Sequence, residues 1–102
     1  MQFSVRVVCP ESAPEDHITF QTMIDKAVVQ CAPNTFHPTG SRKVTCDGFE
    51  ITYEMSDNLD SDKRLLFLSQ CIEAGLSEIN QQRRNIGKAP IDYFVRQKKT
   101  IS

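Results

Sequence analysis

The sequence from Arg42 to Met55 predicts a β-hairpin, and this prediction constrains the fold more than any other feature of the chain. Asp47-Gly48 separates two runs of β-forming residues and is typical of a two-residue type I′ turn. Such a turn would place Val44 opposite Ile51 and sort apolar side chains onto one face of the hairpin. Because a lone hairpin is unstable in water, the rest of the chain must cover that face.

Two segments before the hairpin predict a strand and a helix. Phe3 to Cys9 alternates apolar and polar residues, as in a half-buried strand. Ser12-Ala-Pro-Glu15 has the capping-box pattern, so we expect a helix from Ala13 to Ala32. The composition of Pro33 to Ser41 is typical of a loop. The apolar stripe of this helix comprises Phe20, Met23, Ile24, Ala27, Val28 and Cys31.

A second helix is predicted after the hairpin, from Asp62 to Ile86. We expect Gly75 to kink or split this long helix and Gly87 to cap it. Leu66 and Phe67 lie off its apolar stripe, so the first turns are apolar on a second side. These two residues are therefore a candidate interface. The stripe itself comprises Leu65, Leu68, Ile72, Leu76, Ile79 and Ile86.

The last segment fits two structures. Ile91, Tyr93 and Val95 alternate as in a strand, whereas Pro90 at a first helical position fits a short helix. We favour the strand. Residues 97–102 are interpreted as a basic tail that is free to move.

The resulting order is strand, helix, strand, strand, helix, strand, which predicts an α+β fold. We expect an antiparallel sheet of three or four strands with two helices packed on one face, in the ferredoxin-like β-α-β-β-α-β order. This order places the first and third strands side by side at the centre. An exposed edge strand would invite pairing with another chain. The uncovered face would present Arg6, Lys43, Thr45, Glu50, Thr52 and Glu54.

Length and composition indicate one domain spanning residues 1–102. The net charge of −1 does not by itself require a polyanionic partner. We expect a cytoplasmic protein without membrane contact, because no apolar run approaches the roughly 18 residues that cross a bilayer. The chain contains Cys9, Cys31, Cys46 and Cys71, which we interpret as reduced and buried; their wide spacing argues against zinc.

No known catalytic motif occurs in the chain, so an enzyme is the least supported class. His17 lies at the edge of the apolar stripe of its helix, where packing is a better explanation than general-base catalysis. We assign no catalytic, cofactor-binding or metal-binding residue from the sequence.

The first functional hypothesis is a small, non-enzymatic binding or regulatory protein that acts through protein–protein contacts and forms a homodimer through Leu66 and Phe67. The alternative is nucleic-acid binding, and a second alternative is a small-molecule-binding or catalytic α+β domain. The basic residues that would contact nucleic acid or another anion are Arg83, Arg84, Lys88, Arg96, Lys98 and Lys99.

Overall fold

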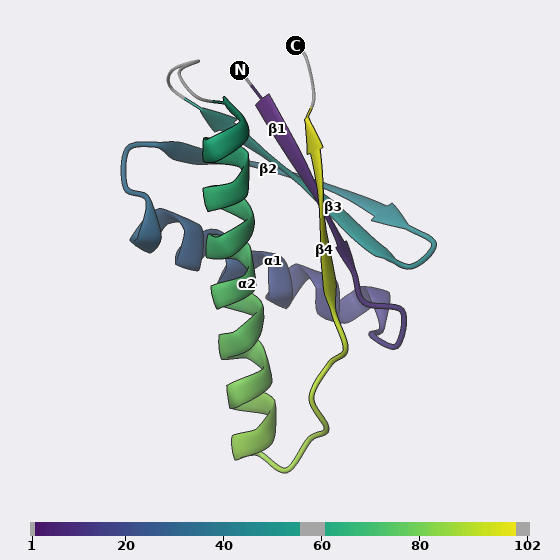
Figure 1. The fold of residues 1–102 in the computed structure, drawn as a ribbon. Coiled ribbons are helices and arrows are strands. Elements are labelled where there is room, and N and C mark those ends of the chain that lie inside the picture. Colours follow the sequence, from purple (N-terminus) through teal and green to yellow (C-terminus); the bar gives the residue numbers. More distant parts are fainter. Residues whose placement is uncertain (1, 56–60, 100–102) are drawn as a thin grey trace.

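A computed structural model describes residues 2–55 and 61–99, and it confirms the α+β fold class (Figure 1). The elements are β1 (Gln2–Val8), a short 3-10 helix η1 (Pro14–Asp16), α1 (His17–Cys31), β2 (Phe36–Thr45), β3 (Gly48–Met55), α2 (Ser61–Asn85) and β4 (Phe94–Lys99). The strands form one antiparallel sheet in the order β2-β3-β1-β4. The first and third strands are therefore adjacent at the centre, as predicted.

Both helices cover the same face of the sheet. The alternate residues of β1 that start at Phe3, and those of β3 that start at Phe49, are buried in one hydrophobic core with residues of α1 and α2. Tyr53 of this core donates a hydrogen bond of 2.5 Å from its hydroxyl to Asp25 of α1. None of the described helices is long and apolar enough to span a membrane.

The hairpin is present, but its turn lies one residue earlier than predicted. Thr45 pairs with Gly48, so the two loop residues are Cys46 and Asp47 rather than Asp47 and Gly48. Neither loop residue has a positive φ, which excludes the predicted type I′ turn.

Gly48 has a different role from the one its sequence context predicts. It pairs with Val8 of β1, and a Cβ atom at this position would lie 1.9 Å from the Val7 carbonyl oxygen. The adjacent Asp47 carbonyl accepts a hydrogen bond of 2.8 Å from the Cys9 amide. The glycine therefore permits β3 to approach β1 closely, and it does not supply turn flexibility.

The pairing register of the hairpin differs from the predicted one by two residues, because Val44 pairs with Phe49 instead of Ile51. A shift of two residues keeps every side chain on its predicted face, since side chains alternate along a strand. Ile51 is buried as expected. Val44 is not: it is 57% exposed near the turn, on the edge strand β2.

The start of β2 also differs from the prediction, which placed a loop from Pro33 to Ser41. The strand begins at Phe36, which pairs with Met55 and is buried. Between Pro38 and Arg42 a β-bulge interrupts the ladder, and Gly40 has a φ of 79° there. The proline and glycine that indicate a loop are accommodated by an irregular edge strand.

The predicted capping box is not formed. The Ser12 hydroxyl donates to the Cys9 carbonyl at 2.8 Å, and α1 begins only at His17, after η1. The first helix is therefore shorter than expected at its amino end. At its carboxyl end, Cys31 is exposed although it belongs to the predicted stripe.

The second helix is continuous and has no sharp bend (Figure 1), so the expected kink or split at Gly75 is wrong. A Cβ atom on Gly75 would lie 3.0 Å from the Ile24 Cα atom, so this glycine allows α1 and α2 to approach closely. The predicted cap is confirmed: Gly87 has a φ of 78°, and the Lys88 amide donates to the Arg83 carbonyl at 2.8 Å. Ile86 is 69% exposed and does not belong to the core.

The last segment forms a strand, as favoured, but β4 begins at Phe94. Ile91 lies before it and is buried in the core, and the Asn80 side chain fixes its backbone with hydrogen bonds of 2.7 and 3.0 Å. Residues 97–99 of the predicted mobile tail belong to β4; residues 100–102 lie outside the described residues.

The cysteines fall into two groups. Cys9 and Cys71 are buried as predicted, whereas Cys31 and Cys46 are exposed, and none of the four is in a disulfide. Burial, with the neighbouring Cys31 thiol, raises the pKa of the Cys71 thiol to about 12. The buried thiols therefore remain protonated at neutral pH, as expected for small hydrophobic side chains.

Candidate functional site

The sheet has a face that neither helix covers, and we call it the open face. On the central strands β1 and β3, its side chains alternate with those of the core. The open face includes Gln2, Ser4, Arg6 and Val8 of β1, His37, Lys43 and Thr45 of β2, Glu50, Thr52 and Glu54 of β3, and Phe94 and Arg96 of β4. The six polar residues expected on the uncovered face are all among them. Ser4 is nevertheless buried, and its hydroxyl lies 3.2 Å from that of Thr52.

A row of charged residues crosses all four strands of the open face. Lys43 pairs with Glu50, Glu50 with Arg6, and Arg6 with Arg96. Directly opposed cations such as Arg6 and Arg96 repel each other unless other groups compensate their charge.

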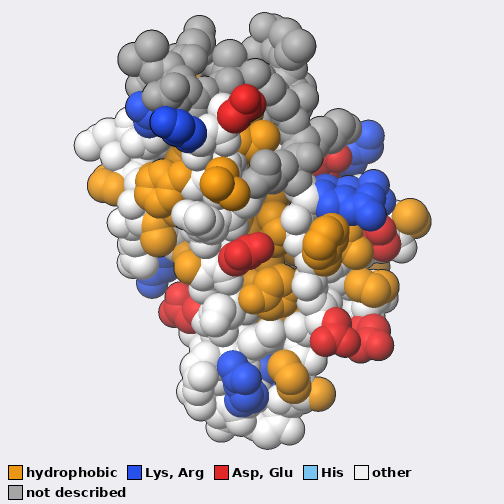
Figure 2. Space-filling model, viewed as in Figure 1, with side chains coloured by type: hydrophobic (Ala, Val, Ile, Leu, Met, Phe, Trp, Pro, Cys, Tyr) orange, Lys and Arg blue, Asp and Glu red, His pale blue; other side chains and the backbone are white. Residues whose placement is uncertain are grey.

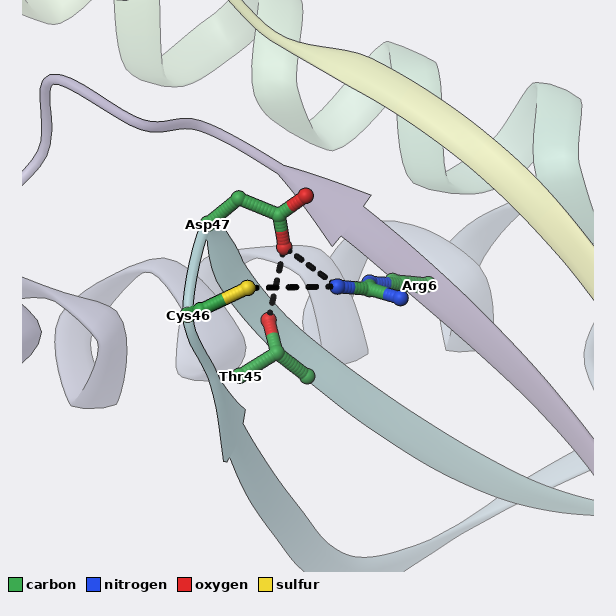
Figure 3. Close-up of polar contacts among 4 residues, drawn as sticks. All are labelled: Arg6, Thr45, Cys46 and Asp47. Carbon is green, nitrogen blue, oxygen red and sulfur yellow. Dashed lines mark hydrogen bonds and ion pairs between the residues drawn. The ribbon is translucent and has the colours of Figure 1, made fainter.

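Asp47 compensates Arg6 (Figure 3). Arg6 Nη2 donates to Asp47 Oδ1 at 2.6 Å, and the Thr45 hydroxyl donates to the same oxygen at 3.1 Å. The hydrogen bond from Arg6 lowers the pKa of Asp47. Because both side chains are about one-third exposed, the ion pair contributes little stability. Its main effect is to tie the hairpin turn to β1.

The described residues provide no such compensation for Arg96. It is exposed, and its guanidinium carbon lies 5.6 Å from the centre of the Phe94 ring, which is itself 57% exposed. Within residues 2–55 and 61–99, no carboxylate forms an ion pair with Arg96. The β4 edge of the open face therefore carries an exposed cation next to an exposed aromatic ring.

The basic residues proposed from the sequence are divided between two elements. Arg83 and Arg84 lie in the last turn of α2 and Lys88 follows the helix, whereas residues 96, 98 and 99 belong to β4 (Figure 1). Arg83 Nε donates to the Ala89 carbonyl at 2.8 Å. The structure does not gather these positions on one element.

Leu66 and Phe67 lie on the surface at the amino-terminal end of α2. They are 53% and 41% exposed, and the Phe67 ring packs against the buried ring of Phe36 with 6.4 Å between centroids. Figure 2 shows hydrophobic side chains exposed over this half of α2. The interface proposed from the sequence is therefore an exposed apolar surface that is continuous with the core.

The structure also brings together three residues that the sequence did not connect: Cys9, Ser12 and His17. His17 Nε2 lies 2.8 Å from the Ser12 hydroxyl oxygen and 3.8 Å from Cys9 Sγ. Only 3% of His17 is exposed, and its ring packs against Phe49 with 4.7 Å between centroids. The spacing of these residues along the chain matches no known motif, so only the folded loop after β1 reveals the cluster.

The hydrogen bonds in this cluster favour a structural role. If Ser12 donates to the Cys9 carbonyl, then His17 Nε2–H donates to Ser12, and Nδ1 is an unprotonated acceptor. To act as a base toward Ser12, His17 would instead need a protonated Nδ1. Nδ1 is buried and has no hydrogen-bond partner among the described residues, and an unpaired buried N–H is costly. The cluster therefore fixes the loop after β1, consistent with the packing role expected for His17.

We predict that His17 makes the fold less stable in mild acid. Burial, with the charge of Arg42, lowers the pKa of His17 below its ordinary 6.5, so the unfolded chain binds this proton at higher pH than the folded chain. The stability that neutral His17 contributes is fully present above pH 6.5. As the pH falls from 6.5 through the pKa of the folded protein, the free energy of unfolding decreases by at most about 1.4 kcal/mol per pH unit.

Urea unfolding between pH 7.5 and 5 would measure this loss. The His17→Gln variant should show a shallower dependence of the free energy of unfolding on pH than the wild type. An identical slope in the two proteins would contradict the assignment of this dependence to His17.

A cavity of about 250 Å³ lies beside Ser12, between the loop after β1 and the carboxyl end of α2. Its charged lining residues are Glu11 and Asp16 on one side and Arg83 on the other. Among residues 2–55 and 61–99, no group of His, Cys, Asp and Glu side chains is arranged to hold a metal ion.

Fold and surfaces together define the class of this chain: a small α+β domain with one face of its sheet covered by helices and the other open. No protein-family model, curated protein or solved structure matches the chain significantly.

Proposed function

We propose that this chain is a small, non-enzymatic binding protein that acts through protein–protein contacts and forms a homodimer. The observation that carries the proposal is the exposure of Leu66 and Phe67 on consecutive positions of α2. Their neighbours Leu65 and Leu68 are buried in the core, so this part of the helix is apolar on two sides. Its second apolar side has no covering element among the described residues.

A second copy of the chain is a suitable partner for this surface. In a two-fold dimer the interface is formed by the same patch of both subunits, so the exposed apolar side chains of one subunit cover those of the other. Phe67 already packs on Phe36, which would limit the side-chain entropy that it loses on association.

A cytoplasmic location is part of this proposal. Cys31 and Cys46 are exposed free thiols, and such thiols persist in a reducing compartment. A regulatory role would follow if dimerisation controls access to a further partner.

Sedimentation velocity over a range of concentrations tests the dimer. We expect dimers at high micromolar concentration in the wild type. A double variant with Leu66→Lys and Phe67→Lys should weaken association at least about tenfold, because it places charge in an apolar contact. Ile86→Lys is the matched control, since Ile86 is 69% exposed at the other end of the same helix.

A wild-type protein that is strictly monomeric at high micromolar concentration would contradict the homodimer. Equal weakening by Ile86→Lys and by the double variant would show that the dimer does not form through Leu66 and Phe67.

A further inference from the structure

The two edges of the sheet differ in their ability to accept another strand. β4 lies at one end of the order β2-β3-β1-β4 and pairs with β1 at six consecutive positions without a bulge. It contains no proline. Within the described part of the chain no strand pairs with its other side, so alternate backbone groups of a regular strand face outward there.

The opposite edge is irregular. β2 contains Pro38, and a bulge with Gly40 at a φ of 79° interrupts its ladder. The Thr39 hydroxyl donates to the Thr52 carbonyl at 3.0 Å, which fixes the bulge against β3. Proline and bulges are features that prevent edge strands from pairing with other chains. β4 is therefore the better template for an added strand.

The side chains of β4 indicate which kind of segment would fit. Phe94 and Arg96 are exposed on the open face, whereas Val95 is half-buried on the helix face and packs against the core. The sequence continues with further cations at positions 98 and 99. A complementary strand would carry acidic residues on its open-face side and apolar residues on its helix-face side.

We propose that the outward edge of β4 binds an extended segment of another protein in which acidic and apolar residues alternate. The added strand would form backbone hydrogen bonds along β4, and its acidic residues would compensate Arg96. A second copy of β4 is a poor occupant, because its sequence contains cations and no acidic residue that could compensate Arg96. This inference shares with the proposed function only the assumption that the chain acts by binding proteins.

Fluorescence anisotropy with a labelled hexapeptide of alternating glutamate and valine, titrated with the full chain, tests the inference. Two further peptides are N-methylated on complementary sets of alternate amides. Because only one edge of an added strand bonds β4, one methylated peptide should bind like the parent and the other at least about tenfold more weakly. Equal binding of the two methylated peptides, or no binding of the parent at millimolar protein, would overturn the proposal.

Charge substitutions complete the test. Arg96→Glu should weaken binding of the parent peptide at least about tenfold, whereas Arg84→Glu, the same change at an exposed residue of α2, should not. Equal losses in these variants would indicate only general charge attraction and would contradict a site on β4. The double variant of Leu66 and Phe67 should bind the peptide like the wild type, so failure of the dimer and failure of this site are distinguishable.

Discussion

Gly48→Ala is expected to lower the free energy of unfolding by at least about 3 kcal/mol. The added Cβ atom would lie 1.9 Å from the Val7 carbonyl oxygen, and this backbone atom cannot move without breaking the pairing of β1 with β3. Both strands are central in the sheet, so the disturbance would reach the whole core. Urea unfolding followed by circular dichroism measures the effect.

Gly40→Ala is the matched control. Gly40 has a positive φ of 79°, but a Cβ atom there would meet no heavy atom within 4 Å. Only backbone strain applies, and we expect a loss of about 1 kcal/mol. Equal effects of the two substitutions would contradict the close approach of β3 to β1.

Phe49→Ala is expected to cost about 3–5 kcal/mol, because it removes a fully buried ring and leaves a cavity beside His17. Val44→Ala should change the free energy of unfolding by no more than about 0.5 kcal/mol, since Val44 is 57% exposed. The two residues pair directly across the hairpin, so the comparison isolates burial from position in the sheet. Similar losses would show that Val44 belongs to the core, as the sequence alone predicted.

Val44 illustrates which features of the fold can be predicted from the sequence and which cannot. Alternation along the strands assigns each side chain to a face, and this assignment survives a register error of two residues because the period of a strand is two. Exposure depends in addition on where the helices end over the sheet. That is a long-range property, and the pattern within β2 contains no signal for it.

Glycines and caps show a similar limit. The cap at Gly87 depends on local backbone geometry and was predictable from its place after the helix. Gly48 and Gly75 were misinterpreted because each is required by a neighbouring element, Val7 of β1 and Ile24 of α1. A turn or a kink is the local explanation for a glycine, and only the packed structure reveals a close approach between elements.

The candidate surfaces were predicted in part. The sequence indicated Leu66 and Phe67 from their position off the apolar stripe, and the structure places both on the surface. The cluster of Cys9, Ser12 and His17 was missed because the predicted capping box assigned Ser12 to another partner. Its hydroxyl instead bonds the Cys9 carbonyl, a contact that depends on the path of the loop after β1.

The central claim is that β1 lies inside the sheet while β4 forms a free edge. Amide hydrogen exchange measured by NMR tests it most directly. We expect slow exchange at all paired amides of β1, and in β4 slow exchange only at alternate amides, with rapid exchange between them. Rapid exchange along β1, or uniform protection along β4 in the monomeric protein, would contradict this strand order and the surfaces assigned from it.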